Sequence, residues 1–265
     1  MKPPATLIVE IGEVPIRLTV RDPSLAELLA DRYRPFLIAS AAPAFELDVE
    51  TARFDSEDGA DDLIVERVEG RWHAARGDFR AEWDPVRRLG RVEQTANPYS
   101  LDAVLRILHT LLLADEGGFL IHASSVVRGD RAFLFTGPSG AGKTTIVRLA
   151  PPDVTILTDE ISYVRRRANG YVTFGTPFAG ELGVAGTPVS APVARIFRLA
   201  HADAHRHAAL TEAGAVRTLL RNILFFAEDA GLTSRMLETA CAVAASVPTS
   251  ELAFAPDSSV WETLS

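Results

Sequence analysis

The chain has 265 residues, which suits one or two domains and suffices to bury a core without disulfides or a structural metal. Its 27 basic and 35 acidic residues give a net charge of −8. That charge argues against a general nucleic-acid-binding surface or a polybasic membrane anchor, because both need a basic field. The single cysteine, Cys241, excludes an internal disulfide and a cysteine-rich zinc site. It lies in an Ala-rich stretch, where we expect a small core residue.

Hydrophobic residues make up 47% of the chain and charged residues 23%, as in ordinary globular proteins. The N-terminal residues lead into a strand-like run that does not resemble a signal sequence. No stretch approaches the roughly 18 apolar residues that a membrane span needs. The sequence therefore predicts a soluble, cytoplasmic protein with no nucleic-acid or membrane partner.

The first hundred residues are predicted to be rich in β-structure. A hairpin turns at Gly12-Glu13, a short helix follows Pro23, and the acidic segment 55–62 is expected to be a solvated turn. The expected elements are strands 7–11, 14–20 and 46–51, a helix over 23–30, and a loosely alternating stretch over 71–83. Within that stretch, Trp72, Phe79 and Trp83 are expected to be packing anchors. No catalytic motif occurs in this part of the chain.

A break at Asn97-Pro98 precedes a helix, because the residue before a proline is disfavoured in helical conformation. Ser100 is expected to cap the helix, and leucines at helical spacing continue it until Gly117-Gly118. We place a domain boundary near residue 98. The sequence thus predicts a β-rich N-terminal region over 1–98 and a catalytic domain over 99–265.

The second part alternates strands and helices in an α/β pattern. The expected elements are strands 119–127, 132–136, 154–157, 161–164, 171–174 and 194–199, a short helix before Pro151-Pro152, and helices at about 213–227 and 233–247. Asn169-Gly170 has the composition of a hairpin turn. A tail containing Trp261 completes the chain.

A phosphate-loop signature lies between the second of these strands and the short helix. Residues 137–144 match G-x-x-x-x-G-K-[ST] at every fixed position. The glycines let backbone N–H groups surround a phosphate, Lys143 reaches the β- and γ-phosphates, and Thr144 offers a hydroxyl to Mg²⁺. The predicted nucleotide-binding residues are Gly137, Pro138, Ser139, Gly140, Ala141, Gly142, Lys143, Thr144 and Thr145.

The loop alone does not define the reaction. The chain has no N-K-x-D motif for guanine recognition and no L-S-G-G-Q segment of transporter ATPases. These absences leave two interpretations of the phosphate loop, a kinase-like phosphotransferase or a less typical ATPase.

Two further sites accompany the loop. His122 lies on the strand that precedes the phosphate-loop strand, where it is either a core residue or a member of the same site. Asp159-Glu160 follows a buried strand, so these carboxylates are expected at the edge of the sheet where ligands bind. A carboxylate there can hold Mg²⁺ or accept a proton from an incoming hydroxyl.

The ordered set formed by Leu120-Ile121-His122-Ala123, the phosphate loop, and Leu157-Thr158-Asp159-Glu160 resembles the catalytic domain of HPr kinase/phosphorylase. It is more similar still to the shorter HPr-kinase-related proteins of bacterial gene clusters. Segment 176–181 and the closing segment 247–261 also resemble that group. The resemblance covers roughly residues 99–265, and more loosely the β-rich N-terminal part. It implies a phosphate-loop core like those of HPr kinase and the carboxykinases, with a mixed sheet.

The resemblance also implies roles for single residues. Asp159 would accept the proton of a substrate hydroxyl, and His122 would assist at the same site. Glu181 would correspond to a second carboxylate near the metal, although the family's Gly-rich signature after it is reduced here. Glu160 stands where the family has a second aspartate. The arginine-containing segment linked to phosphate removal has no match, which puts the reverse reaction in doubt.

Three groups of basic side chains give weaker signals. His201, His205 and His207 could bind Zn²⁺ or Ni²⁺, but a polar loop accounts for them without a metal. Residues 165–167, three consecutive arginines, are expected to form a solvated hairpin end or to face an acidic substrate. Arg217 and Arg221 share a helix face and are expected at the surface, with phosphate contact as the alternative.

Together these features predict an ATP- and Mg²⁺-dependent kinase. Lys143, Asp159 and His122 are the predicted catalytic residues, and Thr144, Glu160 and Glu181 the predicted metal ligands. The acceptor is predicted to be a serine or another hydroxyl of a protein or peptide. A small-molecule phosphotransferase and a non-catalytic nucleotide-binding partner protein are the alternatives, and a homo-oligomer is left open.

Overall fold

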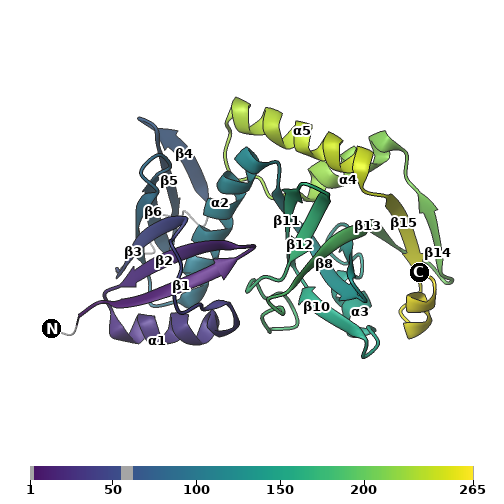
Figure 1. Cartoon of the computed structure of the whole chain (residues 1–265), viewed down its shortest axis with the longest axis horizontal. Helices are drawn as coiled ribbons and strands as arrows, with labels where there is room; N and C mark the ends of the chain where they lie inside the picture. The colour runs from purple at the N-terminus through teal and green to yellow at the C-terminus, as the bar shows by residue number, and fades with distance from the viewer. Residues whose placement is uncertain (1–2, 55–61, 265) are drawn as a thin grey trace. The chain divides into compact units, whose positions relative to one another are not determined.

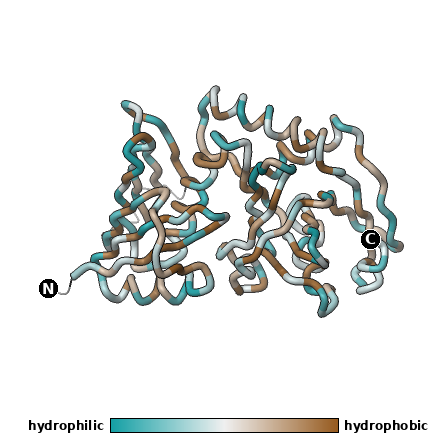
Figure 2. The backbone as a smooth tube through the Cα atoms, in the orientation of Figure 1, coloured by the Kyte–Doolittle hydropathy of each residue, from teal (hydrophilic) through white to brown (hydrophobic). Residues whose placement is uncertain are grey.

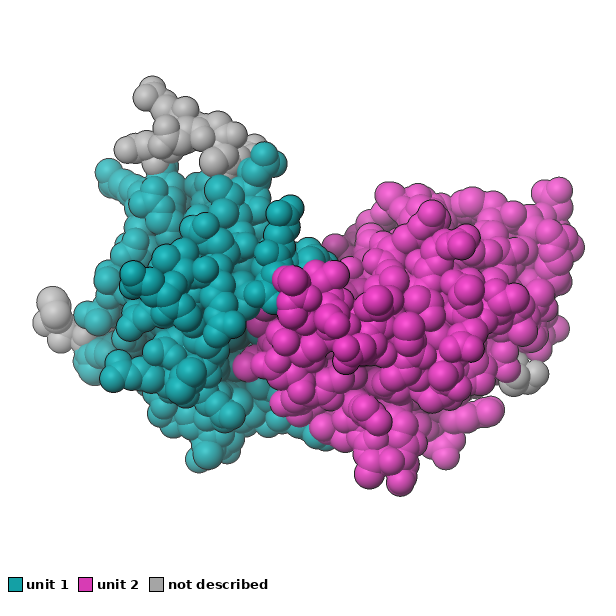
Figure 3. Space-filling model, turned by 90° about the horizontal axis from the view of Figure 1, so that it is seen from above, with its two compact units in different colours: residues 1–109, 225–229 teal, residues 110–224, 230–265 magenta. Residues whose placement is uncertain are grey.

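The computed structural model describes residues 3–54 and 62–264. Segment 55–61, most of the predicted acidic turn, lies outside the described residues. The chain forms two compact units (Figure 3), of which unit 1 comprises residues 1–109 with 225–229 and unit 2 comprises residues 110–224 with 230–265. Each contains a mixed β-sheet, which confirms a mixed α/β fold. The division falls inside a helix, between His109 and Thr110, and the catalytic-domain boundary near residue 98 stays a prediction.

Unit 1 is built on a seven-stranded sheet with the order β1-β2-β3-β7-β6-β5-β4 (Figure 1). Its strands are β1 Ala5–Ile11, β2 Val14–Val20, β3 Phe45–Thr51, β4 Ile64–Val68, β5 Arg71–Arg76, β6 Phe79–Asp84 and β7 Leu89–Gln94. β3 pairs in parallel with β2 and β7, and the other neighbours are antiparallel. Among the described residues, the helical segments of this part of the chain are α1 Pro23–Arg32, η1 Arg34–Phe36 and α2 Pro98–Glu116.

The predicted hairpin and first helix are confirmed. Gly12 and Glu13 both have positive φ, 62° and 61°, as a two-residue turn between right-twisted strands requires. Asp22 caps α1, because its carboxylate accepts from the N–H groups of Ser24 and Leu25. The alternating stretch over 71–83 is divided into β5 and β6.

The sheet of unit 1 has one buried face and one polar face. The predicted anchors Trp72, Phe79 and Trp83 are all buried, as the alternation along β5 and β6 requires. Hydrophobic residues (brown in Figure 2) accordingly recur along the strands. Gly90 on β7 permits this packing, because a Cβ there would lie 2.7 Å from the Trp83 Cβ.

The helix after Asn97 begins three residues earlier than predicted. Asn97, not Ser100, caps it, since the Asn97 Oδ1 accepts from the Tyr99 N–H at 3.0 Å. Pro98 occupies the first helical position, where its missing N–H costs nothing. The Ser100 hydroxyl instead donates to Asp78 at 2.6 Å.

Unit 2 is built on an eight-stranded sheet in which β9 pairs with both β8 and β13. Its strands are β8 Phe119–Arg128, β9 Arg131–Thr136, β10 Val154–Thr158, β11 Ile161–Arg167, β12 Gly170–Phe174, β13 Ser190–His201, β14 Arg206–Ala209 and β15 Thr249–Phe254. The first half of β8 pairs with β11 and the second half with β9 and β10. β9, β13 and β15 are parallel neighbours. Neither β14 nor β15 was predicted from the sequence.

The remaining helical segments of this unit are α3 Lys143–Arg148, α4 Glu212–Asn222, α5 Ala230–Ser246 and η3 Ser258–Glu262. An aromatic cluster forms part of the core beneath α3. The rings of Phe135 and Phe197 stack at 5.6 Å, and Trp261 meets Phe135 edge-on at 5.8 Å. The Trp261 indole donates to the Ile146 carbonyl, which ties the end of the chain to α3.

The prediction for Cys241 is wrong. Cys241 is exposed on α5. The buried face of that helix is formed by Leu232, Met236, Thr239, Ala240 and Val243. Because this stripe repeats at three- and four-residue intervals, position 241 falls outside it. In the part of the chain that the structure describes, no helix is long and apolar enough to cross a membrane.

Candidate functional site

The phosphate-loop signature connects β9 to α3 in unit 2. Gly137, Gly140 and Gly142 have φ values of 153°, 77° and 99°, a region that residues with a side chain rarely adopt. At Gly142 a Cβ would also lie 2.8 Å from the ring of Phe254, at the end of β15. The loop conformation therefore depends on these glycines for both backbone freedom and space.

Lys143 is buried at the first turn of α3, with 8% of its surface exposed. Its Nζ donates to the carbonyl oxygens of Gly137 and Pro138, at 3.0 and 3.1 Å. Burial lowers the pKa of this amine below its usual range, while the nearby carboxylates of Glu160 and Glu181 act in the opposite direction. The amine is thus held against the loop and faces negative charge.

The predicted site residues meet around a cavity of about 510 Å³. Its lining comprises His122, Ser139, Gly140, Gly142, Lys143, Thr144, Thr145, Asp159, Glu160, Ala179, Gly180 and Glu181. The pairing of β8 with β11, which sets His122 opposite Ile161, brings the histidine next to the acidic pair. Four segments distant in sequence therefore converge on one cavity. Gly137, Pro138 and Ala141 complete the loop without lining it.

Asp159 is nearly buried and binds the loop that follows β12. Its Oδ1 accepts from the Gly180 N–H and its Oδ2 from the Leu182 N–H, both at 2.8 Å. A Cβ at position 180 would lie 2.8 Å from the Asp159 Oδ2 and 2.9 Å from the Glu160 Cβ, so a side chain there would displace the acidic pair. The carboxylate therefore has a fixed orientation at the wall of the cavity.

Thr158 fixes the acidic pair from the preceding position. Its hydroxyl oxygen accepts from the N–H groups of Glu160 and Ile161, at 3.2 and 3.3 Å. The Ala123 N–H donates to the Glu160 carbonyl at 2.9 Å, which joins this turn to β8. Glu160 is consequently held at the end of the sheet, facing the phosphate loop.

Glu181 lies between the two residues that Asp159 binds. Its side chain is 74% exposed, and its carboxylate lies 3.9 Å from the Arg148 guanidinium of α3. An exposed ion pair at this distance holds a side chain weakly. Glu181 thus belongs to the site through its backbone position, while its carboxylate stays free to reorient.

A scan against protein-family models and a search of curated proteins each found no match to this chain. The chemistry of the site therefore has to follow from its own geometry. That geometry combines a buried amine, two carboxylates facing it, a third carboxylate held by backbone N–H groups, and an imidazole.

The histidine cluster is distributed over separate contacts. The His201 Nε2 lies 2.7 Å from the Gly140 carbonyl, and the His205 Nε2 lies 3.1 Å from Asp257 and 2.9 Å from the Ser259 hydroxyl. His207 packs edge-on against Phe197. Within residues 3–54 and 62–264, no group of three or more His, Cys, Asp or Glu side chains is arranged to hold a metal ion.

The predicted arginine sites differ from one another. Arg165 does not fit the expected solvated hairpin end, because its side chain is only 12% exposed and pairs with Glu116 at 2.5 Å. Arg217 and Arg221 are exposed on α4, in agreement with a surface position.

Two residues near the phosphate loop were not predicted. The Ser124 hydroxyl on β8 donates to the Lys143 carbonyl at 3.2 Å, and the His201 ring contacts the loop at Gly140. Ser124 lies two residues after His122, on the same side of the strand, which is a signal that the sequence did contain. The contact of His201 depends on the parallel pairing of β13 with β9, which local sequence does not reveal.

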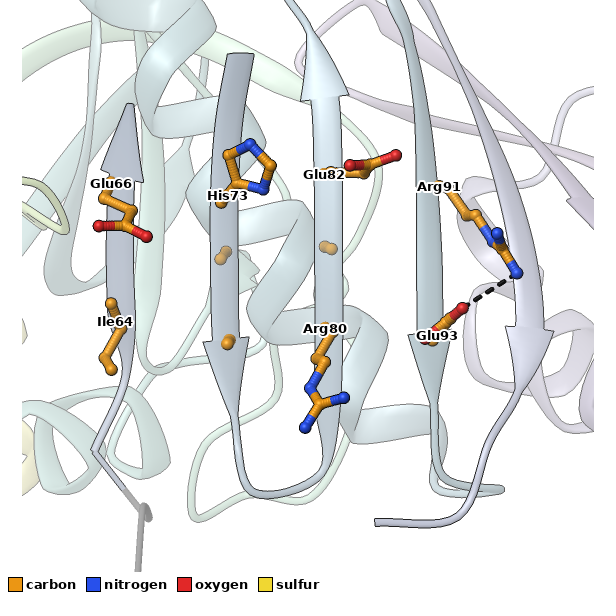
Figure 4. A pocket seen from close by; sticks show the side chains of 10 residues that line it. Ile64, Glu66, His73, Arg80, Glu82, Arg91 and Glu93 are labelled. Carbon is orange, nitrogen blue, oxygen red and sulfur yellow. Dashed lines mark ion pairs between the residues drawn. The ribbon is translucent and has the colours of Figure 1, made fainter. Parts of the chain in front are cut away.

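A different cavity, of about 380 Å³, lies over the polar face of the sheet in unit 1 (Figure 4). The strand register places Glu66, His73, Glu82 and Arg91 in one row across β4 to β7. Arg91 is paired with Glu93 and with Glu50, each at 3.0 Å. This cavity contains none of the predicted site residues, so unit 2 holds the candidate site.

Proposed function

We propose that the chain is an ATP- and Mg²⁺-dependent kinase that transfers the γ-phosphate to a hydroxyl of a protein or peptide. The convergence of His122, the phosphate loop and the Asp159-Glu160 pair on one cavity carries this proposal. A phosphate loop alone supports nucleotide binding. A carboxylate at the same cavity adds a group that can accept the proton of an attacking hydroxyl.

Lys143 would exchange its two carbonyl contacts for the β- and γ-phosphates of the nucleotide. Both present partners are neutral oxygens of its own loop. Phosphate oxygens offer charge-assisted hydrogen bonds, which are about twice as strong as neutral ones. The loop N–H groups would surround the same phosphates.

The residues around the cavity fit Mg²⁺. Thr144 supplies a hydroxyl, and Glu160 and Glu181 supply carboxylates, all hard oxygen donors. In kinases Mg²⁺ is held by one or two carboxylates together with substrate phosphates, and these three groups would supply the protein's share of the ligands. When bound, the ion would neutralise charge that develops on the transferred phosphoryl group.

Asp159 is the proposed proton acceptor. The acceptor hydroxyl oxygen forms a bond to the γ-phosphorus while the bond to the bridging oxygen breaks, ADP leaves, and the hydroxyl proton passes to the Asp159 carboxylate. Each carboxylate oxygen accepts one backbone hydrogen bond and has capacity for another. His122, at the same cavity, would orient the acceptor or the phosphate.

We further propose that unit 2 has a core of the HPr kinase type. The order of His122, the phosphate loop and Asp159-Glu160 along the chain, and their convergence on one cavity, support this assignment. The mixed sheet is compatible with it.

The full chain with labelled ATP, Mg²⁺ and serine-containing peptides tests the proposal. Mass spectrometry should find phosphoserine, and calorimetry should find Mg²⁺-dependent ATP binding. A chain that binds no ATP contradicts the phosphate-loop assignment. Binding without transfer to any hydroxyl would instead favour a nucleotide-dependent partner protein.

A further inference from the structure

A second cavity in unit 2 shares Asp159 with the candidate site. It has a volume of about 390 Å³ and lies between β10 and the loop 182–187. Asp159 lines both cavities. The two cavities are therefore neighbours that share this carboxylate as part of their walls.

The wall of this second cavity is held in place by backbone contacts. The Thr187 N–H donates to the Ile156 carbonyl at 3.0 Å, and the Leu182 N–H donates to Asp159. At Gly186 a Cβ would lie 1.6 Å from the Leu157 carbonyl oxygen, so the loop approaches β10 as closely as backbone allows. Ligand cavities are usually preformed in this way.

The lining combines aliphatic side chains with three threonine hydroxyls, Gly186 and one carboxylate. Val154 and Ile156 contribute from β10, and Leu182, Val184 and Ala185 contribute from the loop. Among the described residues of this lining, Asp159 is the one charged side chain. Val184 is 62% exposed, so part of its aliphatic surface contacts water. Covering that surface with an apolar ligand group is favourable. Such a cavity favours an uncharged aliphatic group and disfavours an anionic one.

We propose that this second cavity binds an aliphatic side chain of the peptide that carries the acceptor hydroxyl. The inference rests on the proposed function, because a hydroxyl that gives its proton to Asp159 lies beside a carboxylate that lines both cavities. In an extended peptide, neighbouring residues are about 3.3 Å apart along the chain. A Leu, Ile or Val one or two residues from the acceptor serine can therefore reach the second cavity.

Peptides with a central serine, and with Leu, Lys or Asp placed at one neighbouring position at a time, provide the test. Incubation with the full chain and MgATP should give a kcat/KM at least about tenfold higher for Leu than for Asp at one or two positions, since a hydrophobic pocket discriminates by roughly 10–200-fold. ATP affinity is measured by calorimetry on the same protein.

Val184→Asp tests the cavity itself, and Val189→Asp is its matched control. Both valines are exposed, in the same loop, but Val189 does not line the cavity. Val184→Asp should remove the preference for Leu through a raised KM and improve the Lys peptide, because the new carboxylate attracts a cation. Val189→Asp should leave both kcat/KM values at the wild-type level.

The outcomes separate this inference from the proposed function. Absence of ATP binding overturns both. ATP binding without phosphorylation of any peptide overturns the peptide acceptor. Transfer at equal rates to the Leu, Lys and Asp peptides, or an unchanged preference in Val184→Asp, overturns the cavity assignment and leaves the kinase in place.

Discussion

Polar side chains in the two units form hydrogen bonds and ion pairs with different kinds of partner. In unit 1 they mostly bind one another. Arg91 pairs with Glu50 and Glu93 on the open face of the sheet, and in the interior Arg32 and Tyr33 both bind the Asp102 carboxylate. In unit 2 many bind backbone groups, several of them in distant segments. Such contacts join Ser124 to Lys143, Thr136 to His122, Ser162 to Ala123, Thr176 to Ile161, and Asp159 to Gly180 and Leu182.

This difference explains why candidate chemistry is confined to one unit. Side chains paired with each other satisfy their charges and leave little for a ligand. Side chains that hold loop backbone fix the position of other groups, as Asp159 fixes the loop that carries Glu181. A catalytic site needs such fixed geometry, because small displacements of the reacting groups lower the rate strongly.

Asp159→Asn should have the largest effect and should affect unit 2 alone. General-base assistance contributes about 10²–10⁴-fold in rate, so phosphoryl transfer should fall by that factor while ATP still binds. The amide also offers an N–H towards a backbone N–H, which loosens the loop at Gly180 or Leu182. Hydrogen exchange at these two amides should accelerate.

Glu160→Gln is the matched control for Asp159→Asn. It makes the same chemical change one residue away. We expect it to raise the Mg²⁺ concentration needed for half-maximal transfer, with a smaller effect on the maximal rate. Wild-type transfer by Asp159→Asn would identify Glu160, Glu181 or His122 as the next candidate for the base.

Asp102→Ala should have the next largest effect and should affect unit 1. It leaves the buried Arg32 guanidinium without its partner, a change that typically costs about 3–5 kcal/mol of stability. Trp72 and Trp83 report on unit 1 and Trp261 on unit 2, so urea unfolding followed by fluorescence can separate the two. Asp31→Ala, which removes an exposed ion pair to Arg34, should change stability by less than about 1 kcal/mol. Equal losses of stability in the two variants would contradict the expectation that the buried ion pair contributes more than the exposed one.

Lys143→Ala should weaken ATP binding without destabilising unit 1. Hydrogen bonds to charged groups contribute about 1.5–3 kcal/mol, which corresponds to a roughly ten- to hundredfold higher Kd by calorimetry. Arg148→Ala, on the exposed side of α3, is the control and should retain ATP affinity close to that of the wild type. Unchanged affinity in Lys143→Ala would place the nucleotide elsewhere.

Gly70→Ala and Gly183→Ala should have the smallest effects and form a pair across the units. Both glycines have positive φ, 83° and 69°, and a Cβ at either position meets no atom within 4 Å. Each substitution should therefore cost only the backbone strain, about 1–2 kcal/mol, measurable by calorimetric unfolding. A much larger loss of stability in Gly183→Ala would show that the loop beside Asp159 also adopts backbone conformations that alanine cannot.

Local signals were the predictable part of the fold. The hairpin at Gly12-Glu13, the phosphate loop and the turn at Asn169-Gly170 depend on residues a few positions apart, and all three motifs were visible in the sequence. The pairing of β15 with β13 joins segments about fifty residues apart. No local pattern encodes that pairing, and β14 and β15 were consequently missed.

The candidate site was predictable in its members but not in their connections. Asp159 was identified from its place after a buried strand. Its hydrogen bonds to Gly180 and Leu182, 21 and 23 residues further along, depend on how the loop after β12 folds back. Cys241 shows the same limit, because an Ala-rich helix gives no clear apolar stripe and tertiary packing decides which side is buried.

The burial of Lys143 has a consequence for chemical labelling. The sequence contains only two lysines, Lys2 and Lys143. Because burial lowers the pKa of the Lys143 amine, a larger share of it is neutral and nucleophilic near neutral pH than for an ordinary lysine. An acyl-phosphate derivative of ATP would bring its reactive carbonyl to this amine. The mass of the acylated peptide would then identify Lys143 as the residue beside the bound nucleotide. With one other lysine in the sequence, such a reagent would report nucleotide occupancy on the purified protein.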